Sequence, residues 1–284
     1  MTSSSSDTIS STSSTEESNI VSAEYPWAID LVLITTILAL SGVGIYFHFS
    51  KGKEQTPTEV APLTWSTDVW DGKTVSASEF KEDYAGRGTN TKTINSAESF
   101  IHFVNEVNSG KDFKDYTIYL NSHIDLNGYT INSIGSETHP FKGTFDGSYY
   151  TIQNAKINGT GLFGYTESKE IKNLGLYNCE ITTGSNIAAG LIGKAVNTNI
   201  SNTFVRLGKI SSAQNVAGLV GEYVSNNGTH TIENSFADTI YNAENASGLA
   251  YSIDTNNSSE NAVTVTNCYY TNAEKAINTK DNFV

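Results

Sequence analysis

The chain has few basic residues. Lys and Arg number 17 against 30 Asp and Glu, which gives a formal net charge of −13 at pH 7. A nucleic-acid-binding surface needs clustered positive charge, so this balance argues against nucleic acid as a partner. An acidic surface instead keeps a protein soluble and opposes non-specific association.

Cysteine is almost absent: the chain has two, Cys179 and Cys268. We expect both to be unpaired and partly buried thiols, which behave as small apolar side chains. Two such cysteines do not identify the redox compartment.

The sequence also lacks the short motifs of common enzyme classes. None of the five histidines opens an H-E-x-x-H pair, and neither G-x-S-x-G nor G-x-x-x-x-G-K-[ST] is present. We therefore predict no catalytic residue, no cofactor and no metal site. Chemistry that needs only carboxylates stays open.

What the sequence does contain is a short repeat, Gly-Leu-x-Gly, which returns four times between residues 161 and 251, the last time as the degenerate Gly-Leu-Ala-Tyr. The first glycines lie 29, 28 and 30 residues apart. A nearly constant period of this size indicates a solenoid, in which each repeat stacks on the previous one. The glycines would relieve steric crowding at a corner of each turn. The glycines of this element are Gly161, Gly164, Gly190, Gly193, Gly218, Gly221 and Gly248.

A second repeated element has the form Ile/Val-x-Asn. Its β-branched residue is expected to point into the core, and its asparagine to adopt a left-handed conformation at a bend. Asparagines one turn apart would form an amide ladder, whose contacts, such as that of Asn202, we expect to be buried. The interval from Asn154 to Asn173 is only 19 residues, so that turn is shorter or its register differs. The element includes Ile171, Ile200, Ile232 and Val265, with the asparagines Asn154, Asn173, Asn202, Asn234 and Asn267.

Together the two elements predict an all-β fold, a parallel β-helix over residues 116–284. A turn of 28 to 30 residues accommodates three short strands and three bends. The length of the region then gives about five or six turns.

One helix is expected ahead of these strands, at about 97–109 within an N-terminal capping segment, 65–115. Ser96 has the properties of an N-cap, with Ser99 where a full capping box would have Glu. Phe100, Phe103 and Val107 belong to one apolar stripe, and Gly110 ends the helix. Such a helix covers the open end of a solenoid.

The N-terminal region has a different character. Residues 1–26 form a Ser/Thr-rich, acidic tail that we expect to be disordered. Residues 27–49 form a largely apolar run that carries no charge from Leu31 to Phe47. As a helix the run would span ~34 Å, enough to cross a bilayer if Asp30 is tolerated near one end. A cleaved signal peptide fits less well, because the preceding residues carry no positive charge. A polar linker, 50–64, follows.

The orientation of this membrane segment is ambiguous. Lys51 and Lys53 follow the helix, and the positive-inside rule would place the folded domain in the cytoplasm. Two lysines are a small bias, and large domains can cross a membrane regardless of charge.

The repeats and the motifs before them resemble the GLUG-motif repeat proteins of bacterial surfaces. The resemblance covers about residues 65–270, including the segments 97–110, 124–128 and 141–147 in the family's order. It implies a right-handed parallel β-helix and an adhesin-like role at the cell surface. In relatives the module also occurs beside the catalytic domain of immunoglobulin A-cleaving metallopeptidases, but this chain carries no peptidase motif.

We therefore predict a membrane-anchored surface β-helix that serves adhesion, binding or display, with a carbohydrate or protein ligand on its face. Two alternatives stay open: a polysaccharide-active lyase or hydrolase, and a purely structural spacer or assembly subunit. The enzyme would need two or three carboxylates gathered on one face. A calcium site at Asp125 and Asn127 matches no full loop consensus. The candidate carboxylates are Asp125, Asp146, Glu167, Glu170 and Glu180.

Overall fold

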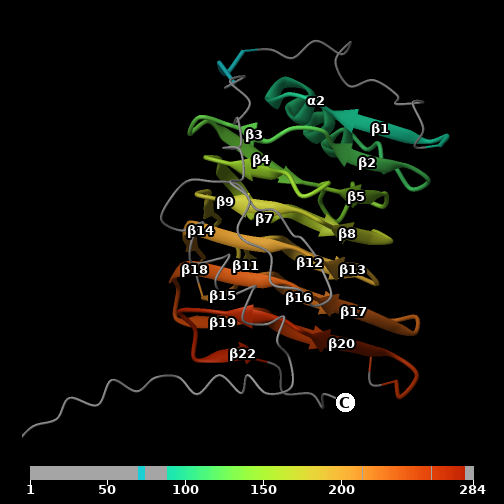
Figure 1. Cartoon of the computed structure of the whole chain (residues 1–284). Coiled ribbons are helices and arrows are strands. Elements are labelled where there is room, and N and C mark those ends of the chain that lie inside the picture. The colour runs from blue at the N-terminus through green and yellow to red at the C-terminus, as the bar shows by residue number, and fades with distance from the viewer. Residues whose placement is uncertain (1–69, 74–87, 213, 257, 279–284) are drawn as a thin grey trace, which may run out of the picture. The chain divides into compact units, whose positions relative to one another are not determined.

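The computed structural model describes residues 70–73, 88–212, 214–256 and 258–278. They all belong to one compact unit, Thr64–Val284, in which short strands wind into a stack of turns (Figure 1). The expected tail, membrane segment and linker lie outside the described residues. Within the part of the chain that is described, no helix is long and apolar enough to cross a membrane.

One side of the stack is a seven-stranded parallel sheet to which each turn contributes one strand. Seven strands enclose six intervals, so the solenoid has about six turns. The strands, in spatial order, are β1 (Thr91–Ile94), β2 (Thr117–Leu120), β5 (Thr144–Asp146), β8 (Glu170–Lys172), β13 (Asn199–Ser201), β17 (Thr229–Glu233) and β20 (Ala262–Thr266).

The other sides form a second, fifteen-stranded parallel sheet that bends around the stack. One turn, from β8 to β12, contains five short strands where three were expected, because additional bends divide the chain. The strands of this sheet are β3 (Ile124–Asp125), β4 (Thr130–Ile134), β6 (Thr151–Gln153), β7 (Lys156–Thr166), β9 (Gly175–Tyr177), β10 (Glu180–Thr182), β11 (Ile187–Ala189), β12 (Ile192–Val196), β14 (Phe204–Ser211), β15 (Asn215–Ala217), β16 (Val220–Val224), β18 (Phe236–Asn242), β19 (Asn245–Asp254), β21 (Tyr269–Tyr270) and β22 (Lys275–Ile277).

Equivalent residues of successive turns lie directly over one another. Ile171 pairs with Ile200, and Ile200 pairs with Ile232. All three side chains are fully buried, while Val265, the next residue in this column, is partly exposed. The predicted parallel β-solenoid is therefore confirmed.

The asparagine bends belong to two different corners. Asn173, Asn202, Asn234 and Asn267 follow the seven-stranded sheet, all with φ near +50°. Asn154 has the same conformation but follows β6, at the corner that it shares with Asn178. The 19-residue interval is thus a change of corner, and the residue one turn before Asn173 is Gly147.

The amide ladder lies at the surface. Asn202 Nδ2 donates to Asn173 Oδ1 over 3.0 Å, and Asn267 Nδ2 donates to Asn234 Oδ1 over 3.1 Å. Asn202 is exposed, so the expectation of a buried contact was wrong. At the corner, only the backbone and the β-branched residue face the core.

The Gly-Leu-x-Gly elements also stack in register: Phe163, Ile192, Val220 and Ala250 form one column. In the three complete copies the second glycine lies against the preceding turn, whereas Tyr251 occupies this position in the fourth. A Cβ on Gly221 would lie 2.5 Å from the carbonyl oxygen of Gly193. Close approach of two backbones therefore excludes any side chain here.

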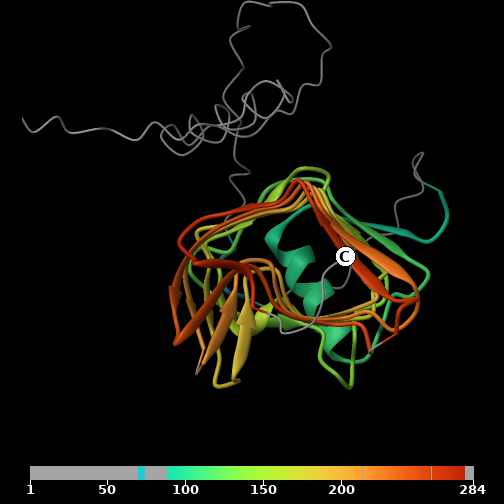
Figure 2. The ribbon, with the colours of Figure 1, turned by 90° about the horizontal axis from the view of Figure 1, so that it is seen from below.

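The helix expected near 97–109 is observed as α2 (Ala97–Asn108). Ser99 completes a reciprocal capping box: its amide donates to Ser96 Oγ over 3.2 Å, and the Ser96 amide donates to Ser99 Oγ over 3.0 Å. The helix connects β1 to β2, and Figure 2 shows it lying across the cross-section of the turns. Its Phe103 ring packs 5.7 Å from the ring of Phe145.

Candidate binding groove

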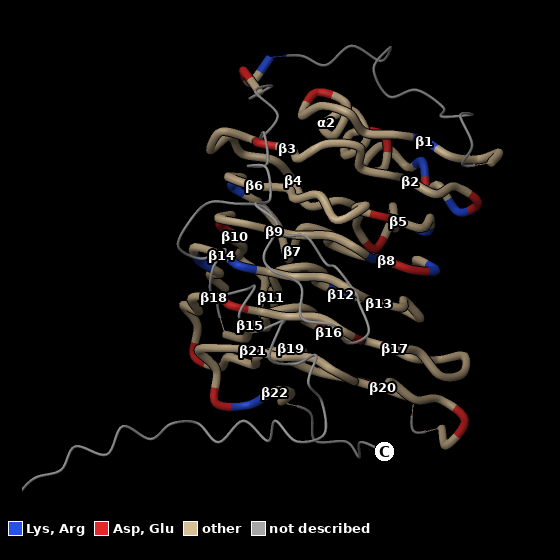
Figure 3. Tube along the Cα trace, in the orientation of Figure 1, with Lys and Arg blue, Asp and Glu red and all other residues tan. Residues whose placement is uncertain are grey.

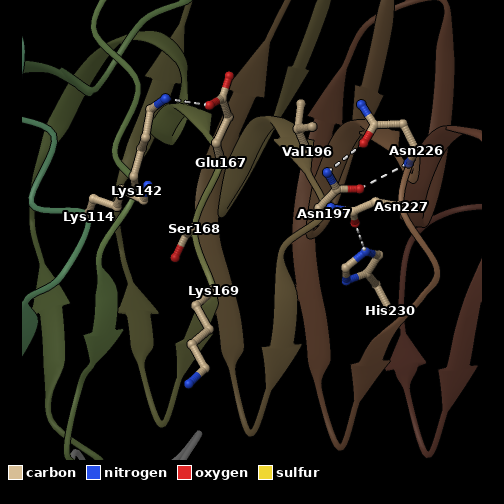
Figure 4. A pocket seen from close by; sticks show the side chains of 10 residues that line it. All are labelled: Lys114, Lys142, Glu167, Ser168, Lys169, Val196, Asn197, Asn226, Asn227 and His230. Atoms are coloured by element: carbon tan, nitrogen blue, oxygen red, sulfur yellow. Dashed lines mark hydrogen bonds and ion pairs between the residues drawn. The ribbon is translucent and has the colours of Figure 1, made fainter.

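A shallow groove runs along the corner that precedes the strands β2, β5, β8, β13 and β17 of the seven-stranded sheet (Figure 4). It has a volume of about 590 Å³ and crosses successive turns of the solenoid. Its lining residues are Lys114, Lys142, Glu167, Ser168, Lys169, Val196, Asn197, Asn226, Asn227 and His230.

One half of the groove carries charge. Lys142 Nζ and Glu167 Oε2 form an ion pair of 2.7 Å, and this hydrogen bond raises the pKa of Lys142. Among the described residues, neither Lys114 nor Lys169 takes part in an ion pair, and both are exposed. The groove therefore presents two exposed ammonium groups that make no ion pair with the described residues.

The floor of this half is held by Ser168. Its side chain is buried, and its hydroxyl donates to the carbonyl oxygen of Gly143 in the neighbouring turn. The Ser168 amide donates to Thr198 Oγ1 over 3.2 Å. These bonds to the turns on either side fix the backbone from which Glu167 and Lys169 project.

The other half of the groove presents amides and an imidazole. Asn197 Nδ2 donates to Asn226 Oδ1 over 2.7 Å, and the backbone N–H of Asn226 donates to Asn197 Oδ1 over 2.9 Å. His230 Nε2 lies 3.1 Å from Asn227 Oδ1. Burial lowers the pKa of His230, which favours the neutral form of its ring. The groove thus offers donors and acceptors spread along its length, suited to a polar, extended ligand.

The candidate carboxylates do not gather in one site, although Asp146 and Glu170 both lie near Lys172 on adjacent strands. Asp125 accepts hydrogen bonds from the Asn127 amide and from the side chains of Gln153 and Asn154, at 2.8 to 3.0 Å. Asp146 accepts from the Ser148 amide over 2.8 Å and from Asn173 Nδ2 over 3.0 Å. Both carboxylates are therefore used to stabilise local turns and to join successive turns of the solenoid by hydrogen bonds.

The three glutamates are also separate from one another. Glu167 pairs with Lys142, and Glu170 pairs with Lys172 over 2.6 Å. Glu180 lies on β10, in the other sheet. Among the described residues no group of three or more His, Cys, Asp or Glu side chains is placed to hold a metal ion, Asp125 included.

Both cysteines are free, with Cys179 buried and Cys268 partly exposed. Burial raises the pKa of Cys179 to about 12 and that of Cys268 to about 11. Each thiol is therefore protonated at neutral pH, and the protonated form is the less nucleophilic one.

Sequence reasoning located the repeat residues but not the groove. The repeat residues build the core and the corners, and none of them is among the residues that line the groove. Glu167, a candidate carboxylate, is the one predicted site residue in the lining. A signal was nevertheless present: Lys114, Lys142 and Lys169 are separated by 28 and 27 residues, which is one turn each.

Comparison with known proteins identifies no relative. No family model matches the chain, and no curated protein or solved structure is significantly similar to it.

Proposed function

We propose that this protein is a membrane-anchored β-helix at the cell surface that binds or displays an extended ligand and carries out no chemistry. The observation that carries the proposal is the groove, which crosses successive turns and presents Lys114, Lys169 and the Asn197 and Asn226 amides. A solenoid offers such extended concave surfaces because its turns repeat along one axis. The resemblance to adhesin-like repeat proteins favours the same role.

The apolar segment 27–49 would supply the anchor. Protease treatment of intact cells tests the location. We expect the folded domain to be removed while the N-terminal tail is protected, and protection of the domain would place it in the cytoplasm instead.

We further propose that α2 caps the stack and that the turns wind right-handedly. The helix connects two adjacent parallel strands, β1 and β2, and such crossovers are right-handed in nearly all proteins. Its buried stripe covers apolar residues that the first turns would otherwise expose.

The binding role is tested with the full chain in membrane vesicles against a panel of purified polysaccharides and cell-surface proteins. We expect wild type to bind at least one of them, and the double variant Lys114→Ala/Lys169→Ala to bind it roughly ten-fold more weakly or worse. Lys209→Ala, an exposed lysine on another side of the solenoid, serves as the control and should bind normally.

Two outcomes would overturn this function. Absence of binding to every member of the panel would indicate a structural spacer. Release of reducing ends or unsaturated products from a polysaccharide, at a rate well above background, would indicate an enzyme.

A further inference from the structure

The strands β9, β14 and β18 form a column at the left of Figure 1, and β21 continues this column. A row of aromatic residues lies on its outer face. Phe204 pairs with Phe236, and Phe236 pairs with Tyr269, so these three residues occupy one position in three successive turns. We call them the aromatic row. They alternate with Val205 and Ala237, which are buried, and therefore point away from the core.

The rings of the aromatic row are accessible. Phe204 and Phe236 are half-buried, and Tyr269 is 43% exposed. The ring of Phe204 fills the space above Gly175, since a Cβ there would lie 2.5 Å from its Cζ. Thr151 Cγ2 bounds the same space at 2.7 Å. The chain therefore positions this ring on the surface of the sheet.

A second row runs beside the first, two residues further along each strand. It consists of Tyr177, Arg206 and Asp238, which are register partners in three turns. Arg206 Nε and Asp238 Oδ2 lie 3.2 Å apart, and Tyr177 is 40% exposed. This polar row supplies hydrogen-bonding groups, and its two charges neutralise each other.

We propose that this face binds a neutral polysaccharide built from β-linked pyranoses with equatorial hydroxyls. Such sugars present axial C–H groups on their faces, which pack on aromatic rings, and hydroxyls at their edges, which match the polar row. The rows repeat once per turn, at about the 4.8 Å spacing of neighbouring strands, as a ligand with a repeating unit requires. The internal ion pair disfavours a strongly charged ligand.

The distribution of charge agrees with this choice. Figure 3 shows acidic and basic residues dispersed along the chain of the solenoid, and this column contains one of each sign in the Arg206–Asp238 pair. The inference rests on the proposed binding function and names the ligand class. It uses a face other than the groove, so the two can be tested separately.

The test is a titration of the full chain with cellohexaose and with chitohexaose. We expect binding of at least one, weakened roughly two- to ten-fold by Phe204→Ala and by Phe236→Ala, as the loss of one aromatic contact implies. Phe236→Tyr keeps the ring and should bind as wild type does. Ile240→Ala removes an apolar side chain that is 62% exposed on β18 and should have no effect.

Thermal unfolding of each variant shows whether a loss of affinity reflects a loss of fold. Unchanged affinity in folded Phe204→Ala and Phe236→Ala overturns the inference, as does failure of wild type to bind either oligosaccharide. If Lys114→Ala/Lys169→Ala alone abolishes binding, the aromatic row is not the site but the binding function stands. A panel protein whose capture depends on Phe236 would show that this face binds protein and would also overturn the inference.

Discussion

Two buried tyrosine hydroxyls of the solenoid differ in their hydrogen bonding. Tyr223 OH donates to the carbonyl oxygen of Thr198 over 2.6 Å, while the buried Tyr241 OH has no hydrogen-bond partner among the described residues. We expect Tyr223→Phe to lower the free energy of unfolding by about 1–3 kcal/mol, because it leaves a buried carbonyl unsatisfied. Tyr241→Phe should change it by less than about 0.5 kcal/mol or raise it. Urea unfolding measures both, and equal losses would contradict these assignments.

Also at the residue scale, His123 should make stability depend on pH. Burial lowers the pKa of His123, and its Nδ1 accepts a hydrogen bond from the Thr151 amide over 3.2 Å. The unfolded chain therefore takes up a proton near pH 6.5, before the folded chain does.

The free energy of unfolding should then decrease as the pH falls from about 6.5 through the lower folded-state pKa. Above pH 6.5 the ionisation of His123 should contribute no pH dependence. The difference in unfolding free energy between wild type and His123→Gln, measured from pH 7.5 to 5, should shrink as the pH falls. A difference that stays constant would show that His123 has its ordinary pKa in the folded protein.

At the scale of elements, the contact between turns depends on the glycine columns. Gly221→Ala would place a methyl group 2.5 Å from the Gly193 carbonyl oxygen, and we expect a loss of about 2–3 kcal/mol because the turns must separate. Gly184→Ala is the matched control, because nothing lies within 4 Å of its Cβ; its effect should be neutral or stabilising by up to about 1 kcal/mol. Comparable melting temperatures would show that the turns are not in contact at Gly221.

The same elements show what the sequence could predict. The period of Gly-Leu-x-Gly was sufficient for the stacking, because the first glycine recurs in all four copies and close backbone contact explains the second glycine in the three complete copies. The Ile-x-Asn motif was less informative. Asn154 and Asn173 both adopt the left-handed conformation, but at different corners of the solenoid, so the local motif cannot show to which corner an asparagine belongs. The groove and the aromatic row were missed because Lys114 and Lys169, or Phe204 and Phe236, become neighbours only when the turns are aligned.

At the scale of the molecule, the stacking of turns explains how the two proposed binding surfaces arise. Each turn contributes one strand to the seven-stranded sheet, so any side chain repeated at the turn period forms a row along the axis. The groove and the aromatic row are two such rows on different sides. Both depend on one property, which is the alignment of residues about one turn apart.

Cross-linking between adjacent turns tests that alignment most directly. Thr144 and Glu170 are register partners on β5 and β8, whereas Glu180 lies in the other sheet. In the full chain, Thr144→Cys/Glu170→Cys should react rapidly with a short bis-maleimide, and Thr144→Cys/Glu180→Cys should not. The native thiols of Cys179 and Cys268 should react slowly with the maleimide, because burial raises the pKa of both. Equal reaction of the two pairs, or reaction of the 144/180 pair alone, would contradict the stacked turns on which both proposed sites depend.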